Sequence, residues 1–485
     1  MVQHVTIIID LMAKVDRLTR RLDDLESENR RLEDQVQKLK KNSQNSSKPP
    51  SSDIVKPKKK KPSHVDDEKG EKRKIGGQPG HKKHTRPFYT DKQIDNIEKH
   101  IQTSCPNCGG LTTPRFDLEY RRLQQVEIKE IPVVKTEHRA YAVWCPTCEA
   151  FHYKPFPKSV IKAGLFQERI TTLVAYLKYV CHCSFSTIRK YIRDVLGENV
   201  CRGYLRKVLE KVSTSLDDPY DELLKRLPLE TLVNADETGH KDKGGKFWTW
   251  LFRTDLYVLF KIDKTRSTQV LIDVLGKSFN GTLGCDYFSS YRCYMRQFNI
   301  TIQFCLAHLI RDVRFLTNLS DPESKDYGNR ILDGIRELFK IIHDRDSFSK
   351  TSFRATLEQA KKTIIEAATT NVPSLLDKKG KELKNHAKNM ADRFNKHGES
   401  YFTFITTPNA DPTNNIAEQA VRFVVIDRHI TQGTRGEPGR KTAERLWTVV
   451  GTCQLQGRSA FNFIREAVHA YFHNQPSPSL LPSPT

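Results

Sequence analysis

The chain has 485 residues and a net charge of +22, from 80 Lys and Arg against 58 Asp and Glu. This length corresponds to about three domains and can bury several cores without disulfides. The excess of positive charge favours an acidic partner, most commonly nucleic acid, over a merely soluble basic protein. No run of about 18 apolar residues occurs, so we expect no membrane span. The N-terminus lacks the features of a signal peptide, which predicts a cytoplasmic protein.

Residues 8–41 carry a heptad pattern. One series of apolar positions is interleaved with a second, which contains a single Asn29. The pattern predicts a leucine-zipper coiled coil in which Asn29 fixes the register, and therefore a homodimer or higher oligomer. The alternative is a lone amphipathic helix packed on its own core. The leading series is Leu11, Leu18, Leu25, Leu32 and Leu39.

Residues 42–100 are rich first in Ser, Asn and Pro and then in Lys, with few apolar side chains. Such a composition cannot form a packed core. We interpret the segment as a basic linker that follows DNA phosphates, with a passive linker as the alternative. The candidate DNA contacts in it are Lys74, Lys82, Lys83 and Arg86.

Residues 101–155 contain two Cys-x-x-Cys pairs, among 11 cysteines in all. Each pair can direct two thiolates at one ion, so the two pairs predict a closed, structural zinc site with four thiolate ligands rather than disulfides. The stretch between them alternates like strands, which predicts a zinc ribbon on a hairpin. A redox function or unbound thiols are the alternatives. The four predicted ligands are Cys105, Cys108, Cys145 and Cys148.

Residues 160–215 have the periodicity of three helices. Ser184 or Ser186 is expected to begin the second, and Gly197 to end it. The short turn before the third helix predicts a helix-turn-helix DNA-binding domain, although basic helices are often only solvated faces. The Cys181–Cys183 segment is expected to be helical and buried. The candidate DNA contacts on the third helix are Arg202, Arg206 and Lys207.

Residues 228–322 alternate between apolar strands and helices in the order β-β-β-α-β-α-β-α. This order matches an RNase H-like α/β core. Asp236 lies on the first strand and Asp286 follows the fourth. Adjacent strand ends would present these two carboxylates at one edge of the sheet.

Residues 323–405 are charged and helical in pattern, which predicts an all-α insertion before the last part of the core, residues 406–472. In that part a helix after Pro412 carries Glu418 and, one turn later, Arg422. Three carboxylates on rigid elements suit two Mg²⁺ (or Mn²⁺) ions in phosphoryl transfer. With 58 acidic residues in the chain, the pattern alone does not single out this triad. The Pro- and Ser-rich residues 473–485 are expected to be disordered.

Taken together, these motifs resemble the DDE transposase of the insertion sequence 66 family, over about residues 10–472. The resemblance rests on the leucine-rich start, NSSKPPSSD, GGQPGHKKHTR, the two Cys-x-x-Cys pairs, ADETG, CLAHLIRD and NNIAEQAVR, in that order. It implies a multidomain α+β protein whose catalytic and Mg²⁺-binding residues are Asp236, Asp286 and Glu418. The chain departs from the usual family pattern at Thr413 and Gln419. Residues that the resemblance implies as support for the core are Cys305, His308, Asn414 and Asn415.

The resemblance further implies binding to the terminal inverted repeats of the chain's own element, followed by DNA cleavage and attack of a 3′-hydroxyl on target DNA. Its expected cofactors are Mg²⁺ or Mn²⁺ and structural Zn²⁺. The expected partners are element ends, target DNA, a second copy of the chain and accessory proteins of the same element, in a prokaryotic cytoplasm at the nucleoid. Two other classes remain open: a non-catalytic DNA-binding regulator derived from a transposase, and a protein scaffold.

Overall fold

The computed structural model describes residues 2–39, 87–101, 103–104, 106–117, 123–126, 132–147, 149–376, 382–383 and 385–482. The chain forms two compact units, one of residues 1–55 with 137–485 and one of residues 56–136. Within the described ranges, helices and strands mix as the expected α+β class requires. None of the helices in these ranges has both the length and the apolar character needed to cross a membrane.

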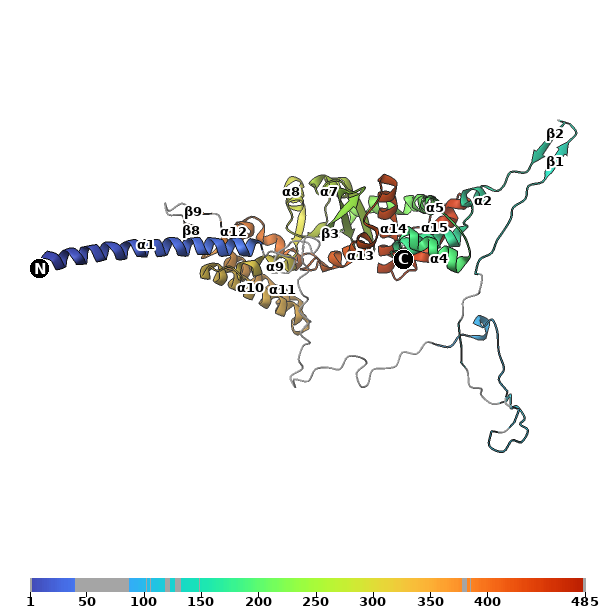
Figure 1. Ribbon diagram of the computed structural model, residues 1–485, viewed down its shortest axis with the longest axis horizontal. Helices are drawn as coiled ribbons and strands as arrows, with labels where there is room; N and C mark the ends of the chain where they lie inside the picture. Colours follow the sequence, from blue (N-terminus) through green and yellow to red (C-terminus); the bar gives the residue numbers. More distant parts are fainter. Residues whose placement is uncertain are drawn as a thin grey trace. The chain divides into compact units, whose positions relative to one another are not determined.

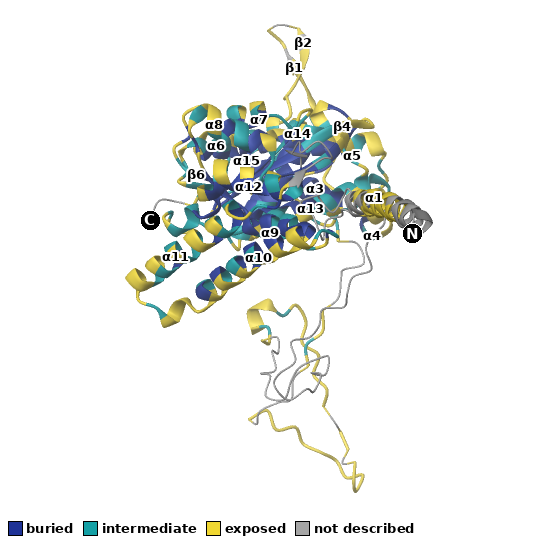
Figure 2. Ribbon diagram, turned by 90° about the vertical axis from the view of Figure 1, so that its left-hand side faces the viewer, coloured by how far each residue is buried: buried dark blue, intermediate teal, exposed yellow. Residues whose placement is uncertain are grey.

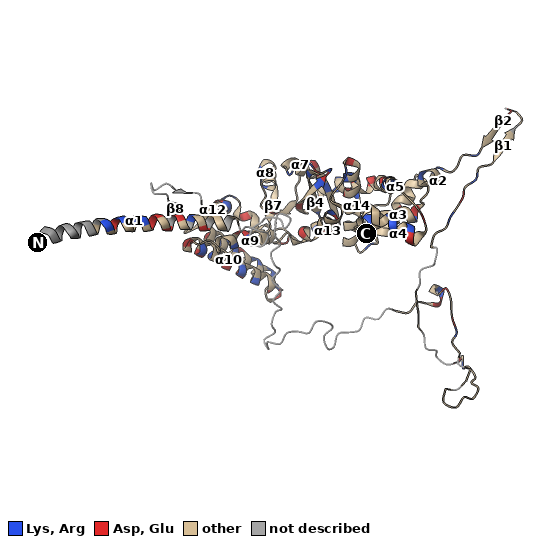
Figure 3. Ribbon diagram, viewed as in Figure 1, with Lys and Arg blue, Asp and Glu red and all other residues tan. Residues whose placement is uncertain are grey.

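The first helix, α1 (Val2–Leu39), covers almost the whole of the predicted coiled coil. From Val15 to Leu39, every position of the two interleaved series is exposed. These positions are Val15, Leu18, Leu22, Leu25, Asn29, Leu32, Val36 and Leu39. Lys and Arg alternate with Asp and Glu along the same stretch (Figure 3). An exposed apolar seam costs free energy in water, so the helix has the surface that a coiled-coil partner would cover. Self-association itself stays a prediction.

The Cys-rich region has two described pieces. In the smaller unit, η2 (Asp91–Gln93) is followed by a bridge between Ser104 and Leu111, and Cys108 of the first Cys-x-x-Cys pair lies in the turn between them. In the larger unit, β1 (Ala142–Cys145) and β2 (Ala150–Tyr153) form an antiparallel hairpin. The stretch predicted to alternate like strands, residues 126–145, contains β1 at its end, but the prediction is wrong for its described residues 126 and 132–141. Cys145, the first residue of the second pair, is the last residue of β1.

A five-stranded mixed sheet forms the core of the larger unit (Figure 1). Its strand order is β5-β4-β3-β6-β7; β3, β4 and β5 are antiparallel neighbours, whereas β3, β6 and β7 run parallel. Strand β6 is buried along its whole length, whereas β3, which contains several polar residues, is buried at most but not all of its positions. The strands are β3 (Leu232–Asp242), β4 (Gly245–Arg253), β5 (Val258–Asp263), β6 (Thr282–Cys285) and β7 (Thr301–Phe304).

Helices α7 (Thr268–Leu275), α8 (Ser289–Phe298) and α9 (Leu306–Leu316) connect and follow the parallel strands. Each predicted element of residues 228–322 is therefore present in the predicted order. After the insertion, α13 (Asn415–Thr431) packs against β3 and β4.

The outer strand of the sheet, β5, is covered by α14 (Glu437–Leu455), whose side chains bond its backbone amides. Thr452 Oγ1 accepts from the Val258 amide at 3.2 Å, Thr448 Oγ1 from the Phe260 amide at 3.0 Å and Glu444 Oε1 from the Ile262 amide at 2.6 Å. The three acceptors are spaced by four residues and so lie on one face of α14. They satisfy amides that an edge strand would otherwise leave open to pairing with another chain.

A helical cluster combines segments from both ends of the larger unit. Ser184 caps α4 with its hydroxyl and Gly197 ends it in the left-handed conformation, as predicted. The last helix, α15, packs against α2, α3 and α5 rather than against the sheet, and buried residues gather at these junctions (Figure 2). The members of the cluster are α2 (Lys158–Ala163), α3 (Glu168–Tyr179), α4 (Phe185–Leu196), α5 (Arg202–Ser215), α6 (Asp217–Arg226), η3 (Leu227–Leu229) and α15 (Ala460–His473).

Two other expectations for this region are wrong. The Cys181–Cys183 segment is neither helical nor buried: it forms the turn between α3 and α4, and Cys181 is exposed. The predicted disordered tail is ordered up to residue 482. Leu480 is fully buried, its carbonyl accepts from Gln456 Nε2 at 2.8 Å, and Ser479 Oγ donates to Glu222 Oε2 at 2.7 Å. The apolar residues among the tail's prolines supply this anchor.

The insertion between β7 and α13 is mainly helical, as predicted. A long antiparallel pair, α10 (Pro322–His343) and α11 (Lys350–Thr369), packs on α9, and α12 (His386–His397) closes the group. Short elements join them: η4 (Arg345–Ser347), β8 (Leu375–Leu376), β9 (Glu382–Leu383), η5 (Gly398–Tyr401) and η6 (Thr403–Ile405).

We expect Thr448→Val to destabilise the sheet, because it leaves the Phe260 amide buried without its acceptor at a cost of about 1–3 kcal/mol. Urea unfolding followed by tryptophan fluorescence measures the loss, and hydrogen exchange of β5 localises it. The matched control is Thr363→Val on the exposed face of α11, expected to change stability by less than about 0.5 kcal/mol. Equal effects of the two substitutions would contradict the role assigned to α14.

Candidate active site

The pairing of β3 with β6 sets Asp236 level with Asp286. The parallel register matches Asn234 with Gly284, and each aspartate lies two residues further along its strand direction. Asp286 directly follows β6, as predicted, but Asp236 is in the middle of β3 and not at the strand end that the sequence predicted, because β3 continues to Asp242. Two carboxylates at one level of adjacent parallel strands lie close together, as the sequence predicted.

Both aspartates are oriented by backbone amides. Asp236 Oδ1 accepts from the Glu237 amide at 2.8 Å, and Asp286 Oδ1 accepts from the Phe288 amide at 2.9 Å. Each bond holds one oxygen of its carboxylate, so the other oxygen remains for a ligand.

Glu418 is brought to the same edge by the buried residue before α13, Asn414. The side-chain oxygen of Asn414, Oδ1, accepts from Asn234 Nδ2 at 2.9 Å, and Asn414 Nδ2 donates to the Ala235 carbonyl at 2.8 Å. Asn234 itself lies over Gly284, where an added Cβ would come within 2.4 Å of Asn234 Nδ2. Gly284 is therefore needed for this close approach. The result is that the start of α13 is tied to β3 beside Asp236.

Cys305, the N-cap residue of α9, completes this anchor. Its Sγ accepts from the Asn414 amide at 3.1 Å, and the next amide, Leu306, donates to the Pro412 carbonyl at 2.9 Å. Arg253 Nη1 also donates to the Ile416 carbonyl, at 2.7 Å. Asn415, by contrast, is exposed.

Glu418 itself faces α9. Arg311 Nη2 donates to its Oε1 at 3.1 Å, and His308 Nδ1 lies 3.5 Å from the same oxygen. Burial, followed by the charge of Arg311, lowers the pKa of His308 to about 3, so this imidazole is neutral near pH 7. Arg311 is therefore the cation that balances Glu418.

Cys305, His308 and Glu418 offer donor atoms within 4.8 Å of one another. Zinc would need the thiolate of Cys305. Burial raises the pKa of this thiol to about 11, and its sulfur already accepts the Asn414 amide. This donor set fits a structural role better than a zinc site.

Several carboxylates are buried together at this edge of the sheet, although burial disfavours their charged forms. Burial, then the charges of Glu237 and Asp286, raise the pKa of Asp236 well above its usual value. Burial and Glu237 raise the pKa of Asp286 to about 7, partly offset by the Phe288 amide and by Arg266 and Arg393. Divalent cations with hard oxygen ligands would relieve this repulsion, so the three carboxylates fit the predicted Mg²⁺ or Mn²⁺.

A fourth carboxylate, Glu237, was not singled out from the sequence. Its side chain is only 1% exposed. Arg266 Nε donates to it at 2.8 Å, and Arg266 Nη2 and the Tyr291 hydroxyl also donate to it. Neighbouring side chains on a strand point to opposite faces, so Asp236 and Glu237 cannot both face the same side of the sheet. A second acidic residue directly after Asp236 therefore indicates buried hydrogen-bond donors on the other face.

The remaining candidate residues lie elsewhere. On α5, Arg202, Arg206 and Lys207 are exposed, and Arg202 Nη2 donates to Ser186 Oγ at 2.7 Å. Arg422 is exposed on α13. Cys145 ends β1 and Cys108 lies in the first Cys-x-x-Cys turn. Outside the described residues lie Lys74, Lys82, Lys83, Arg86, Cys105 and Cys148.

We expect Asp286→Asn to raise the thermal unfolding midpoint of the metal-free protein at pH 8. The pKa of Asp286 is raised to about 7, so its ionised form costs stability above that pH, and the cost fades as the pH falls toward the ordinary value near 4. A gain of about 1 kcal/mol in the free energy of unfolding would raise the unfolding midpoint by roughly 2–4 °C. Midpoints in EDTA at pH 8 and pH 5 measure the gain, which should shrink at pH 5. Asp255→Asn, exposed between β4 and β5, should change neither midpoint; an equal gain at both pH values would contradict the assignment.

Comparison with known proteins matches three parts of the chain to families. Residues 163–442 match the transposase IS66 family, residues 102–149 the zinc-finger binding domain of that transposase, and residues 3–87 a family of unknown function. Two uncharacterized proteins of Sinorhizobium fredii are similar. The protein y4qI is 24% identical over 77% of this chain and 72% of its own length, and y4hP is 19% identical over 76% and 71%. Since the first match spans more than half of the 485 residues, the chain belongs to the IS66 family of transposases.

Proposed function

We propose that the protein is a DNA transposase that binds the terminal inverted repeats of its own insertion sequence and catalyses metal-dependent DNA cleavage and strand transfer. The observation that carries this proposal is the β3–β6 register, which sets Asp236 level with Asp286. The anchor of α13 adds Glu418 at the same edge. We take these three residues as the catalytic and Mg²⁺-binding carboxylates of a DDE mechanism.

The proposed core is RNase H-like. In support, three antiparallel strands are followed by two parallel strands, with the order β5-β4-β3-β6-β7. The helical insertion, at about residues 322–405, separates the last carboxylate from the other two in sequence but not in space.

In this mechanism, two bound Mg²⁺ or Mn²⁺ ions would activate the attacking oxygen and stabilise the leaving oxygen of a phosphodiester. Asp236 and Asp286 contribute oxygens that are already oriented by backbone amides. Glu418 would exchange its bond to Arg311 for the metal. Water is the first nucleophile and frees a 3′-hydroxyl; that hydroxyl then attacks a target phosphodiester in line, and the target strand's 3′-oxygen leaves.

DNA binding is assigned to the segments before the sheet. The zinc-finger match supports a structural Zn²⁺ held by Cys105, Cys108, Cys145 and Cys148. A helix-turn-helix of α4 and α5 would present Arg202, Arg206 and Lys207 to DNA, because all three are exposed. The basic linker would add Lys74, Lys82, Lys83 and Arg86, and Arg422 would contact DNA beside the carboxylates. The exposed seam of α1 would pair protomers so that two ends are held together in the cytoplasm, at the nucleoid.

We expect Glu418→Gln to lower cleavage and strand transfer by at least about 100-fold, because the amide cannot replace a carboxylate on a divalent ion. The assay uses DNA carrying the element's own ends with Mg²⁺ or Mn²⁺, and gel shifts measure end binding, which should stay unchanged. Glu437→Gln, exposed at the start of α14, is the matched control and should remain active.

Strand transfer retained by Glu418→Gln, or by Asp236→Ala, would overturn the triad. Tight end binding without cleavage by the wild type, in the presence of the element's accessory proteins, would favour the alternative of a non-catalytic DNA-binding regulator derived from a transposase.

A further inference from the structure

A pocket of about 470 Å³ lies beside the proposed active site, between α8, α9 and α12. We call it the α8–α12 pocket. Tyr287, the residue after Asp286, lies on its wall, so the pocket begins one residue from a catalytic carboxylate. It has a basic part, formed by Arg292, Arg393 and Lys396, and an apolar part, formed by Phe315, Leu316 and Met390.

The guanidinium groups of the pocket have unused hydrogen-bonding capacity. Among the described residues, Arg292 Nε and Arg393 Nη2 are buried without a hydrogen-bond partner. Arg393 is only 9% exposed; its Nη1 donates to Asp312 Oδ2 at 2.9 Å, and its Nε donates to Tyr401. Buried charged donors without acceptors are costly. An anion in this pocket would supply the missing acceptors once these two buried N–H groups turn toward it.

The Tyr287 ring holds the two arginines together. Arg292 Cζ lies 4.4 Å and Arg393 Cζ 3.8 Å from the ring centre. Such cation–π contacts preorganise the guanidinium groups while leaving their N–H edges for a ligand.

Three cationic side chains line the pocket, against two acidic ones, Asp312 and Asp392. After burial, the charges of Arg292, Lys396, Arg296 and Arg393 lower the pKa of the neighbouring His397. The charge of Arg393 also lowers the pKa of Asp286, against the larger effect of burial.

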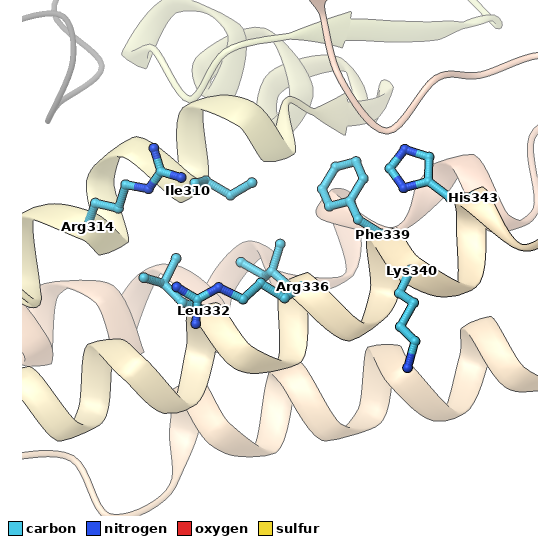
Figure 4. Close-up of a pocket in the computed structure, with 8 residues that line it drawn as sticks. Ile310, Arg314, Leu332, Arg336, Phe339, Lys340 and His343 are labelled. Carbon is cyan, nitrogen blue, oxygen red and sulfur yellow. The ribbon is translucent and has the colours of Figure 1, made fainter. Parts of the chain in front are cut away.

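A second basic groove, between α9 and α10, differs in how many of its cations are already paired with carboxylates. Arg314, Arg336 and Lys340 line it with Ile310 and Phe339 (Figure 4). There Arg336 pairs with Asp333 and Lys340 with Glu337. Two of its cations, Arg336 and Lys340, already have partners on their own helix, and none of its lining residues is next to Asp286 in the sequence as Tyr287 is, so the α8–α12 pocket is the better anion site.

We propose that the α8–α12 pocket binds one nucleotide of the DNA strand next to the reacting phosphodiester, an assignment that rests on the proposed function. The backbone phosphate would lie on Arg292, Arg393 and Lys396, and the sugar and base would lie against Phe315, Leu316 and Met390. Phosphates favour forked guanidinium donors, and a volume of this size suits a ligand of nucleotide size. The pocket would thereby position the scissile bond at Asp286.

The test replaces single phosphates near the cleaved bond by neutral methylphosphonates. With the full-length wild type and Mn²⁺, one position should slow cleavage by about 10- to 100-fold, the usual worth of charged hydrogen bonds. Arg292→Ala should be slowed to a similar extent on ordinary DNA and should be insensitive to methylphosphonate at that position. Arg296→Ala, exposed on the same helix and outside the pocket lining, should keep the wild-type profile.

Retention of the wild-type position profile by Arg292→Ala, or its loss in Arg296→Ala, would overturn the proposal. A binding arm separates this outcome from a failure of the proposed function. The same methylphosphonate series is titrated by fluorescence anisotropy with both variants and the wild type. A position-specific loss of affinity that disappears only in Arg292→Ala supports the pocket even if nothing is cleaved, whereas loss at no position overturns it.

Discussion

The parallel pairing of β3 with β6 is the constraint on which the rest of the candidate site depends. It fixes Asp236 and Asp286 at one level, and it also brings Gly284 under Asn234. Because Gly284 has no side chain, Asn234 can lie flat on β6 and bind Asn414. The same register that aligns two carboxylates therefore determines where α13 begins, and with it the place of Glu418. A shift of β6 by one residue would disturb all three together.

The cost of gathering carboxylates is offset by cations from three different elements. Glu237 is held by Arg266 after β5, and Glu418 by Arg311 on α9. Asp286 is stabilised by Arg266 and by Arg393 on α12. In the part of the chain that the structure describes, Asp236 accepts a hydrogen bond only from the Glu237 amide, and burial and its acidic neighbours raise its pKa well above its usual value. The negative charge of the site is thus balanced by arginine side chains that can move away. A divalent cation that replaces them would gain free energy from its attraction to the carboxylates.

The sequence predicted the parts of this fold that depend on local pattern. Strand and helix order in residues 228–322, the Ser184 cap and the Gly197 terminus follow from apolar periodicity and backbone preference. The aspartates were predictable because each follows a short apolar run, although only Asp286 lies at a strand end, whereas β3 continues six residues beyond Asp236. Glu237, by contrast, gained its role from Arg266 and Tyr291, which are distant in sequence, and no periodicity encodes such a partnership. The tail was misjudged for the same reason: its composition suggested disorder, but Leu480 finds a buried site near α14.

The helices proposed to read DNA are bound to the five-stranded sheet through α6 and α14. Helix α5 packs on α14 and α15, and Arg445 on α14 donates to Ser213 Oγ on α5 at 3.0 Å and pairs with Asp217 on α6 at 2.6 Å. Helix α14 in turn bonds the edge of β5, and Tyr220 on α6 donates to the Phe260 carbonyl at 2.8 Å. Residues 160–215 therefore do not form a separate domain that is only tethered to the core. DNA held by Arg202, Arg206 and Lys207 would lie at a fixed offset from Asp236 and Asp286, so recognition at α5 would also determine which phosphodiester reaches the carboxylates.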